Sequence, residues 1–143
     1  MITKSEIRCA KALNDASEYG SSFARGIRVE CNGFITLYIS GTASIDKDGK
    51  TVHVGDFESQ VKRTFQNIED ILGAEGATWH DVVYTSCFLR DIERDYDAFN
   101  KERTLFYKKR HLATFPASTA VQAILCRPDL LVEIQTTAIF NES

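Results

Sequence analysis

The chain has 143 residues, of which 43% are hydrophobic and 26% are charged. A chain of this length folds as one domain around a single core, so we predict one domain over residues 1–143. Its formal net charge of −3 lacks the basic excess that favours binding to nucleic acids or anionic lipids. We therefore expect neither nucleic acid nor membrane as a partner.

The first 22 residues mix charges with apolar positions, so they resemble neither a signal peptide nor a membrane span. We predict a cytoplasmic protein in which residues 1–22 pack on the domain as an N-terminal extension, with a short strand between residues 2 and 12. The cysteines are far apart and form no C-x-x-C pair, and the histidines lack helical metal-ligand spacing. No metal site is expected. The cysteines are Cys9, Cys31, Cys87 and Cys126.

Residues 23–45 contain two β-rich runs separated by Asn32-Gly33, a strong signal for a two-residue hairpin turn. From residue 56 to 75, apolar side chains recur at steps of three and four, which is typical of an amphipathic helix. Asp56 is its expected N-cap. Residues 81–92 are rich in β-branched and aromatic side chains and predict a third long strand.

A second helix is predicted from about residue 95 to 111, ending before Pro116, and two strands hinged at residues 127–129 follow it. The expected architecture is α+β: one mixed sheet with both helices on one face. The other face would stay bare in a monomer. We therefore expect the chain to oligomerise.

The last predicted strand contains a carboxylate among apolar residues. Alternation places Glu133 on one face with Leu131 and Gln135, and Val132 and Ile134 on the other. A carboxylate within a buried strand is costly unless it is bonded or paired. Glu133 is therefore either a structural acceptor or a chemical group with a raised pKa.

Several segments together resemble the YjgF/RidA family, also called the L-PSP endoribonuclease family. They are YISGTASID, the run from GDFESQ to FLRDI, YDAFNKERTLFY, FPASTAV and LLVEI, in this order and spacing from about residue 23 to 139. The resemblance implies a chorismate-mutase-like fold that forms a homotrimer with three clefts between subunits. It also implies an enamine/imine deaminase that hydrolyses small 2-imino acids to keto acids and ammonia without a cofactor.

The resemblance assigns roles to particular residues. The family glutamate that positions the attacking water corresponds to Glu133, and the cleft serine to Ser40. Phe23 stands where the family has a tyrosine. Ser118 stands where the family has an arginine that clamps the substrate carboxylate, and a hydroxyl does not replace a bidentate guanidinium. With Thr119, Ser118 is expected to supply hydrogen bonds to the ligand.

A second resemblance is to the C-terminal domain of chorismatases, through SGTASI, the helix with GD and NIE, and CRPDLLVEI. In those enzymes the equivalent glutamate acts as an acid near an enolpyruvyl group, and one product class has a cysteine seven residues earlier. Cys126 and Glu133 have this spacing. Cys126 is therefore a candidate catalytic residue, although free cysteines usually act as small buried hydrophobes.

Two other arginines could anchor the carboxylate of a small ligand. Arg25 is the first candidate because it would share a strand face with Phe23, and Arg127 is the second. The leading functional hypothesis is a Rid-type deaminase or related hydrolase or lyase. The alternatives are a non-catalytic ligand-binding or regulatory trimer and a chorismatase-like enol-ether hydrolase. A ribonuclease or translation inhibitor is disfavoured by the acidic charge balance.

Overall fold

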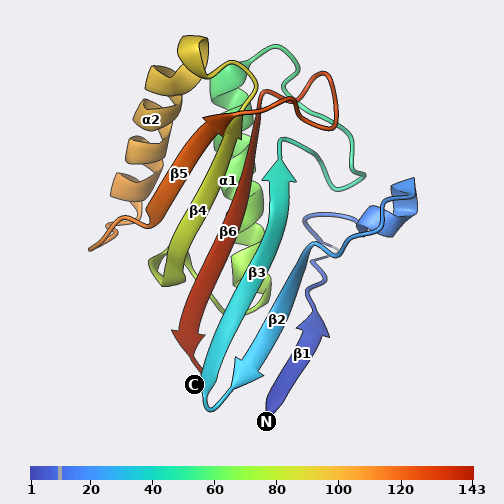
Figure 1. Ribbon diagram of the computed structural model, residues 1–143, viewed down its shortest axis with the longest axis vertical. Helices are drawn as coiled ribbons and strands as arrows, with labels where there is room; N and C mark the ends of the chain where they lie inside the picture. The colour runs from blue at the N-terminus through green and yellow to red at the C-terminus, as the bar shows by residue number, and fades with distance from the viewer. Residues whose placement is uncertain (10) are drawn as a thin grey trace.

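The computed structural model describes residues 1–9 and 11–143 and shows one sheet backed by two helices (Figure 1). The strands are β1 (Ile2–Glu6), β2 (Gly26–Cys31), β3 (Phe34–Ala43), β4 (Val82–Leu89), β5 (Ala117–Gln122) and β6 (Val132–Asn141). The helices are α1 (Phe57–Ala74) and α2 (Ile92–Lys109), with short 3-10 turns η1 (Ala16–Tyr19) and η2 (Trp79–Asp81). Among the described residues, no helix has the length and apolar character that a membrane span requires.

The strand order in the sheet is β1-β2-β3-β6-β4-β5. Only β4 and β5 are paired in parallel, because α2 forms the crossover between them, and the other neighbours are antiparallel. Both helices cover the same face of the sheet (Figure 1). The predicted α+β architecture with one mixed sheet is confirmed.

The hairpin between β2 and β3 turns at Asn32 and Gly33, which have φ angles of 51° and 80°. Positive φ at both central positions defines the type I′ turn that matches the twist of paired strands, and this is why the Asn-Gly signal was informative. The predicted first strand was too long at its start. It begins at Gly26, so residues 23–25 precede the sheet.

Helix α1 begins as predicted, since the Asp56 carboxylate accepts a hydrogen bond from the Ser59 backbone N–H at 3.1 Å. Its apolar face is buried against the sheet, with Val61, Phe65 and Ile68 essentially inaccessible to solvent. The Phe65 ring packs against Trp79 and against Phe106 of α2, at 5.3 and 5.0 Å between ring centroids. This aromatic cluster joins the two helices.

The boundary between β4 and α2 differs from the prediction. The strand ends at Leu89, and the helix begins at Ile92, three residues earlier than expected. Asp91 is the N-cap, and its carboxylate accepts from the Arg94 backbone N–H at 3.1 Å. A β-rich composition continued through residues 90–92 in the sequence, but the capping interaction ends the strand there.

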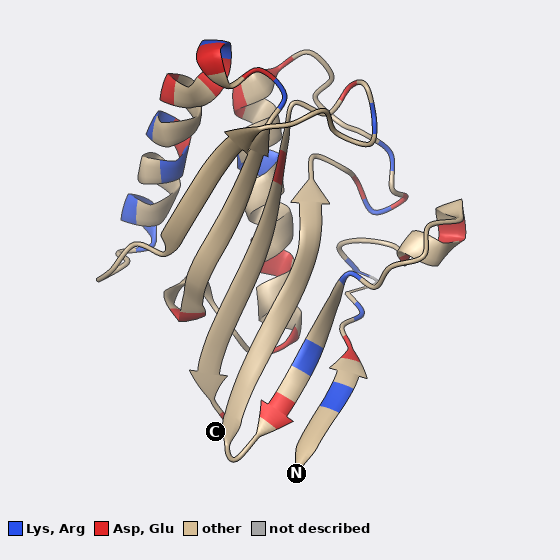
Figure 2. Cartoon of the chain, viewed as in Figure 1, with Lys and Arg blue, Asp and Glu red and all other residues tan. Residues whose placement is uncertain are grey.

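The face of the sheet opposite the helices is open (Figure 1). It carries large apolar side chains, among them Phe34 and Tyr38, which are 57% and 55% exposed, and Ile139. Figure 2 shows the central strands almost free of charged residues on this view, apart from a red band near the start of β6. That band is Glu133, the one charged residue within β6.

A β-bulge interrupts the pairing of β3 with β6. Ile39 pairs with Thr136 and Thr42 with Ile134, so Ser40 and Gly41 together lie opposite Gln135. Bulges of this kind bend a strand and redirect side chains, and they are common beside functional sites. Ala43, after the bulge, lies directly opposite Glu133.

Candidate functional site

Glu133 lies on the open face of β6, between Ala43 of β3 and Phe88 of β4. The predicted alternation is correct, because Val132 and Ile134 are buried under the helices while Glu133 is partly accessible. In the described part of the chain its carboxylate has no hydrogen-bond partner and no ion pair. Burial raises the pKa of Glu133 above its ordinary value. Within the described residues, Glu133 therefore lacks the hydrogen bonds that a structural acceptor would make.

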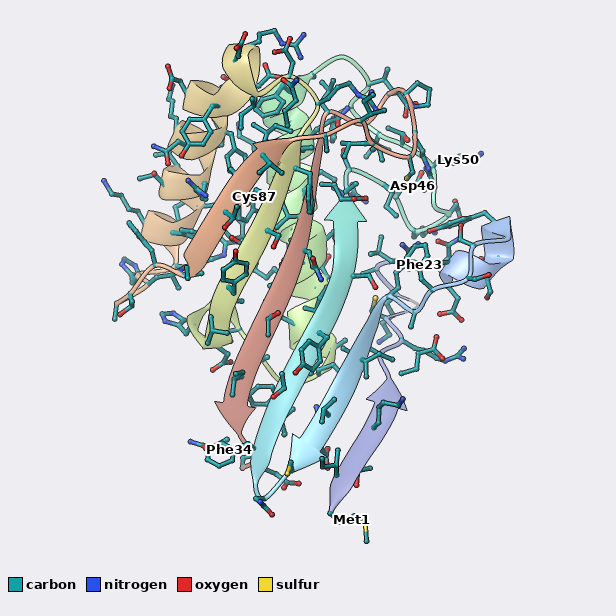
Figure 3. All side chains as sticks on the ribbon, in the orientation of Figure 1. Met1, Phe23, Phe34, Asp46, Lys50 and Cys87 are labelled. Carbon is teal, nitrogen blue, oxygen red and sulfur yellow. The ribbon has the colours of Figure 1, made fainter. Side chains whose placement is uncertain are left out.

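Two adjoining pockets meet at Glu133. One has a volume of about 210 Å³ and the other about 420 Å³, and both are lined by Phe23, Gly41, Cys126 and Glu133. Phe23 is 45% exposed and lies between η1 and the end of β3 that follows the bulge (Figure 3). These volumes suit a small metabolite rather than a large cofactor.

The smaller pocket also contains both candidate arginines. Arg25 and Arg127 line it together with Tyr19, and each guanidinium carbon lies near the Tyr19 ring, at 5.5 and 5.3 Å from its centroid. Arg25 and Phe23 do reach the same pocket, although from the segment before β2 rather than from a strand. Arg127 comes from the loop between β5 and β6. Segments about a hundred residues apart in sequence therefore meet here.

The loop that carries Cys126 and Arg127 is fixed by two polar side chains, one partly buried and one fully buried. Arg90 donates to the backbone carbonyls of Leu130 and Arg127, both at 2.7 Å. Gln60 of α1 donates to the Asp129 carbonyl and accepts from the Leu131 N–H, both at 2.9 Å. Neither residue was identified from the sequence, because both look like ordinary polar positions in regular elements. A glutamine on the apolar face of a helix was the available signal.

Of the remaining candidate residues, Ser40 lies at the pockets around Glu133, whereas Ser118 and Thr119 lie elsewhere. The Ser40 hydroxyl lines the larger pocket and donates to the Ala24 carbonyl at 2.6 Å. Ser118 lines another pocket, of about 160 Å³, where it accepts a hydrogen bond from Arg103 of α2 at 3.1 Å. The Thr119 hydroxyl is bonded to the Tyr84 hydroxyl at 2.6 Å. Within one copy of the chain, Ser118 and Thr119 do not line the pockets around Glu133.

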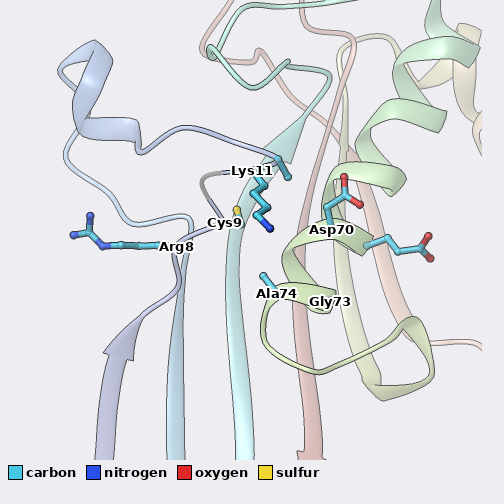
Figure 4. Close-up of a pocket in the computed structure, with 8 residues that line it drawn as sticks. Arg8, Cys9, Lys11, Asp70, Gly73 and Ala74 are labelled. Carbon is cyan, nitrogen blue, oxygen red and sulfur yellow. The ribbon is translucent and has the colours of Figure 1, made fainter.

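A larger cavity, of about 610 Å³, lies between the N-terminal segment and α1 (Figure 4). Figure 4 shows charged side chains of opposite sign around it, including Lys11 and Asp70. Two of its other charges are already neutralised, because Arg8 pairs with Glu6 and Asp15, and Glu69 pairs with Arg110. The carboxylates that line this cavity have bonded partners, unlike Glu133, so we consider it the weaker candidate site.

Comparison with known proteins agrees with the fold and with the family that the sequence resembles. The family described as Endoribonuclease L-PSP matches residues 21–140. The 3-aminoacrylate deaminase RutC of Acinetobacter baylyi is 34% identical over 102 residues, which are 71% of this chain and 77% of that protein.

Two solved structures resemble the chain over nearly its whole length. The Rid-family protein YyfA of Yersinia pestis is 26% identical with a TM-score of 0.76, covering 95% of this chain and 98% of that one. The YjgF protein of E. coli is 24% identical with a TM-score of 0.77, covering 94% and 98%. The chain therefore belongs to the Endoribonuclease L-PSP family, which is the YjgF/RidA family.

Proposed function

We propose that the protein is a Rid-type enamine/imine deaminase that hydrolyses a small carboxylate-bearing metabolite, with Glu133 as the water-positioning or acid/base residue. The proposal rests chiefly on Glu133 itself. This partly buried carboxylate has no bonded partner in the described residues, its pKa is raised by burial, and it lies where two small pockets meet. The similarity to a 3-aminoacrylate deaminase supports the same class of reaction.

The chemistry requires only water, a proton acceptor and oriented donors. Water adds to the imine carbon while the Glu133 carboxylate accepts one of its protons, and the electrons of the C=N bond move to nitrogen, which then takes that proton from the Glu133 carboxyl. The hydroxyl proton of the resulting amino alcohol passes to nitrogen in the same way, through the Glu133 carboxylate. Ammonia leaves as the C–N bond breaks and the C=O bond forms. A carboxyl whose pKa lies closer to the working pH transfers protons in both directions more readily.

The test is the release of ammonia from freshly generated 2-iminobutyrate, measured above the spontaneous rate. We expect Glu133→Gln to lower this rate at least a hundredfold, an order of magnitude typical of a lost general acid or base (about 10² to 10⁴). Glu142→Gln is the matched control, since Glu142 is an exposed carboxylate just beyond the end of β6. A wild-type rate equal to that of buffer would overturn the deaminase proposal.

The proposed active form is a homotrimer of chorismate-mutase-like subunits, with the cleft between neighbouring copies. The exposed apolar side chains of the open sheet face, such as Phe34, Tyr38 and Ile139, support an interface there. Such an interface would also bring residues of a second copy toward Glu133. Light scattering coupled to size exclusion tests the assembly, and a monomer at micromolar concentration would contradict it.

Two alternatives have particular observations in their favour. Ser118 in place of the family arginine favours a trimer that binds its ligand without converting it. Cys126 favours a chorismatase-like enol-ether hydrolysis, because it lines the same two pockets as Glu133. Binding of small keto acids without turnover of any imine would support the first. Release of pyruvate from chorismate would support the second.

A further inference from the structure

Arg25 is a buried cation without an anionic partner. It is only 6% exposed, and its hydrogen bonds are to the Asn14 carbonyl at 2.8 Å, the Asn14 side-chain oxygen at 3.2 Å and the Tyr19 hydroxyl at 2.6 Å. All three acceptors are neutral. No carboxylate of residues 1–9 and 11–143 forms an ion pair with it. Because buried charges in proteins are normally paired, this guanidinium requires an anion from elsewhere.

Arg127 presents a second cation in the same pocket. Its Nη1 donates to the Gly49 carbonyl at 2.6 Å and to the Thr51 hydroxyl at 3.3 Å, which are again neutral acceptors. Its Nε and Nη2 atoms donate to no described residue. In this pocket the only carboxylate is Glu133, and it forms no ion pair with either arginine in the described residues. Two positive charges therefore line one small pocket, and neither forms an ion pair with a carboxylate of the described residues.

The Nε and Nη2 atoms, which are free in Arg127, bind a carboxylate together in two other arginines of this chain. Arg94 holds Asp95 through Nε and Nη2, at 2.9 and 2.7 Å, and Arg110 holds Glu69 through the same two atoms. This side-on geometry forms two parallel charge-assisted bonds. In Arg25, Nε and Nη2 already donate hydrogen bonds to Asn14 and Tyr19, whereas Nη1 donates to no described residue. Arg127 therefore suits bidentate binding, and Arg25 adds a fixed positive charge with one available nitrogen.

From this arrangement we infer that the pocket binds a small dicarboxylate, with one carboxylate on Arg127 and the other on Arg25. The inference rests on the proposed deaminase function and specifies its substrate class: the imine or enamine of an acidic amino acid. The volume of about 210 Å³ fits such a molecule. Hydrolysis adds one water across the C=N bond and gives a 2-oxo dicarboxylate and ammonia, so no oxidant or other reactant is required.

The first experiment compares 2-iminosuccinate with 2-iminobutyrate as substrates of the full-length protein. We expect kcat/KM to be about tenfold or more higher for the dicarboxylate, since a second charge-assisted contact contributes at least that factor. Arg127→Gln should reduce this preference to about twofold or less. Arg94→Gln is the matched control, because Arg94 lies at the start of α2 and already has Asp95 as its partner.

The second experiment measures binding without turnover, in the Glu133→Gln variant. Succinate and oxaloacetate should bind at least about tenfold more tightly than butyrate and 2-oxobutyrate, by calorimetry or thermal shift. Arg25→Lys keeps the buried charge and avoids the risk that a neutral residue prevents folding. It should weaken dicarboxylate binding. The compact lysine ammonium lacks the planar guanidinium that bonds to Asn14 and Tyr19 and still has Nη1 available for a ligand.

The outcomes separate this inference from the proposed function. Glu133-dependent hydrolysis of 2-iminobutyrate without any dicarboxylate preference would overturn the inference and leave the deaminase intact. Arginine-dependent dicarboxylate binding without hydrolysis of any imine would support the pocket and overturn the deaminase. Equal affinity for mono- and dicarboxylates, lost equally in Arg127→Gln, would mean that one carboxylate occupies the site, which contradicts the inference.

Discussion

Gly41 lies directly against the Glu133 side chain. A Cβ atom added to Gly41 would come within 2.9 Å of the Glu133 carboxyl carbon and 3.0 Å of its Oε2 atom. Side-chain atoms do not approach so closely without one of them moving. The absence of a side chain at position 41 therefore determines where the carboxylate lies.

Gly41→Ala should displace the Glu133 carboxylate and lower the hydrolysis of 2-iminobutyrate by about tenfold or more, since misplacing a reacting group by about 1 Å costs up to about a hundredfold. Gly73→Ala is the control. Gly73 lies in α1, and a Cβ atom added there would meet nothing within 4 Å, so this change should raise the melting temperature slightly and leave the rate unchanged. Equal rates for wild type and Gly41→Ala would contradict the role of Gly41.

The raised pKa of Glu133 predicts a pH-dependent effect on stability. Burial favours the neutral carboxyl in the folded protein, so this group is most compatible with folding below its ordinary pKa of 4.5 and becomes unfavourable as pH rises through its folded pKa. Glu133→Gln removes the charge. We expect the variant to melt at a higher temperature than wild type at pH 7 to 8, and at nearly the same temperature near pH 4.

Melting curves recorded across this pH range check the prediction, with Glu142→Gln as the exposed control. A lower melting temperature for Glu133→Gln at pH 8 would show that the carboxylate stabilises the fold through a partner. The same titration should appear in the pH–rate profile, as activity that rises through a pKa above 4.5 if the ionised form accepts the proton.

Gln60→Leu should destabilise the protein and loosen the loop that carries Cys126 and Arg127. The leucine side chain fits the volume but leaves the partly buried Asp129 carbonyl and Leu131 N–H without their Gln60 partner, at a cost of roughly 1 to 3 kcal/mol for each group. Urea unfolding measures the change. Gln66→Leu, an exposed position of α1 bonded only to Asp70, should change the free energy of unfolding by less than about 0.5 kcal/mol.

Cys126 should be the first cysteine to react with iodoacetamide. It is exposed, whereas Cys9 and Cys87 are buried and Cys31 is intermediate. The thiol lines both pockets at Glu133, so alkylation should block the site, and a bound dicarboxylate should slow the reaction. Mass spectrometry of digested protein identifies the modified residue. Inactivation that proceeds at the same rate in Cys126→Ser would assign the effect to another cysteine.

The sequence was sufficient for the features that depend on local periodicity. The apolar spacing of α1, its Asp56 cap, the Asn32-Gly33 turn and the alternation around Glu133 each involve residues close together along the chain, and the structure confirms them. The start of α2 was predicted three residues late. There, β-type composition and the Asp91 cap point to different structures, and the cap with the following helix prevails.

The surroundings of Glu133 could not be predicted in the same way. Arg127 donates to Gly49, 78 positions away, and Gln60 bonds to Leu131, 71 positions away. Such contacts follow from how the loops fold over the end of the sheet. Tyr19, next to both guanidiniums, belongs to a short 3-10 turn that no periodic pattern indicates.

The bulge at Ser40 and Gly41 has a consequence for how fold and site could be separated. Two residues of β3 face one of β6 there, and the pairing on either side is regular, with Ile39 and Thr42 both directed to the helix face. The sheet would keep its register and its buried residues with one residue fewer. The fold does not require that extra position. A single deletion there is the smallest change that would remove the site and leave the sheet complete.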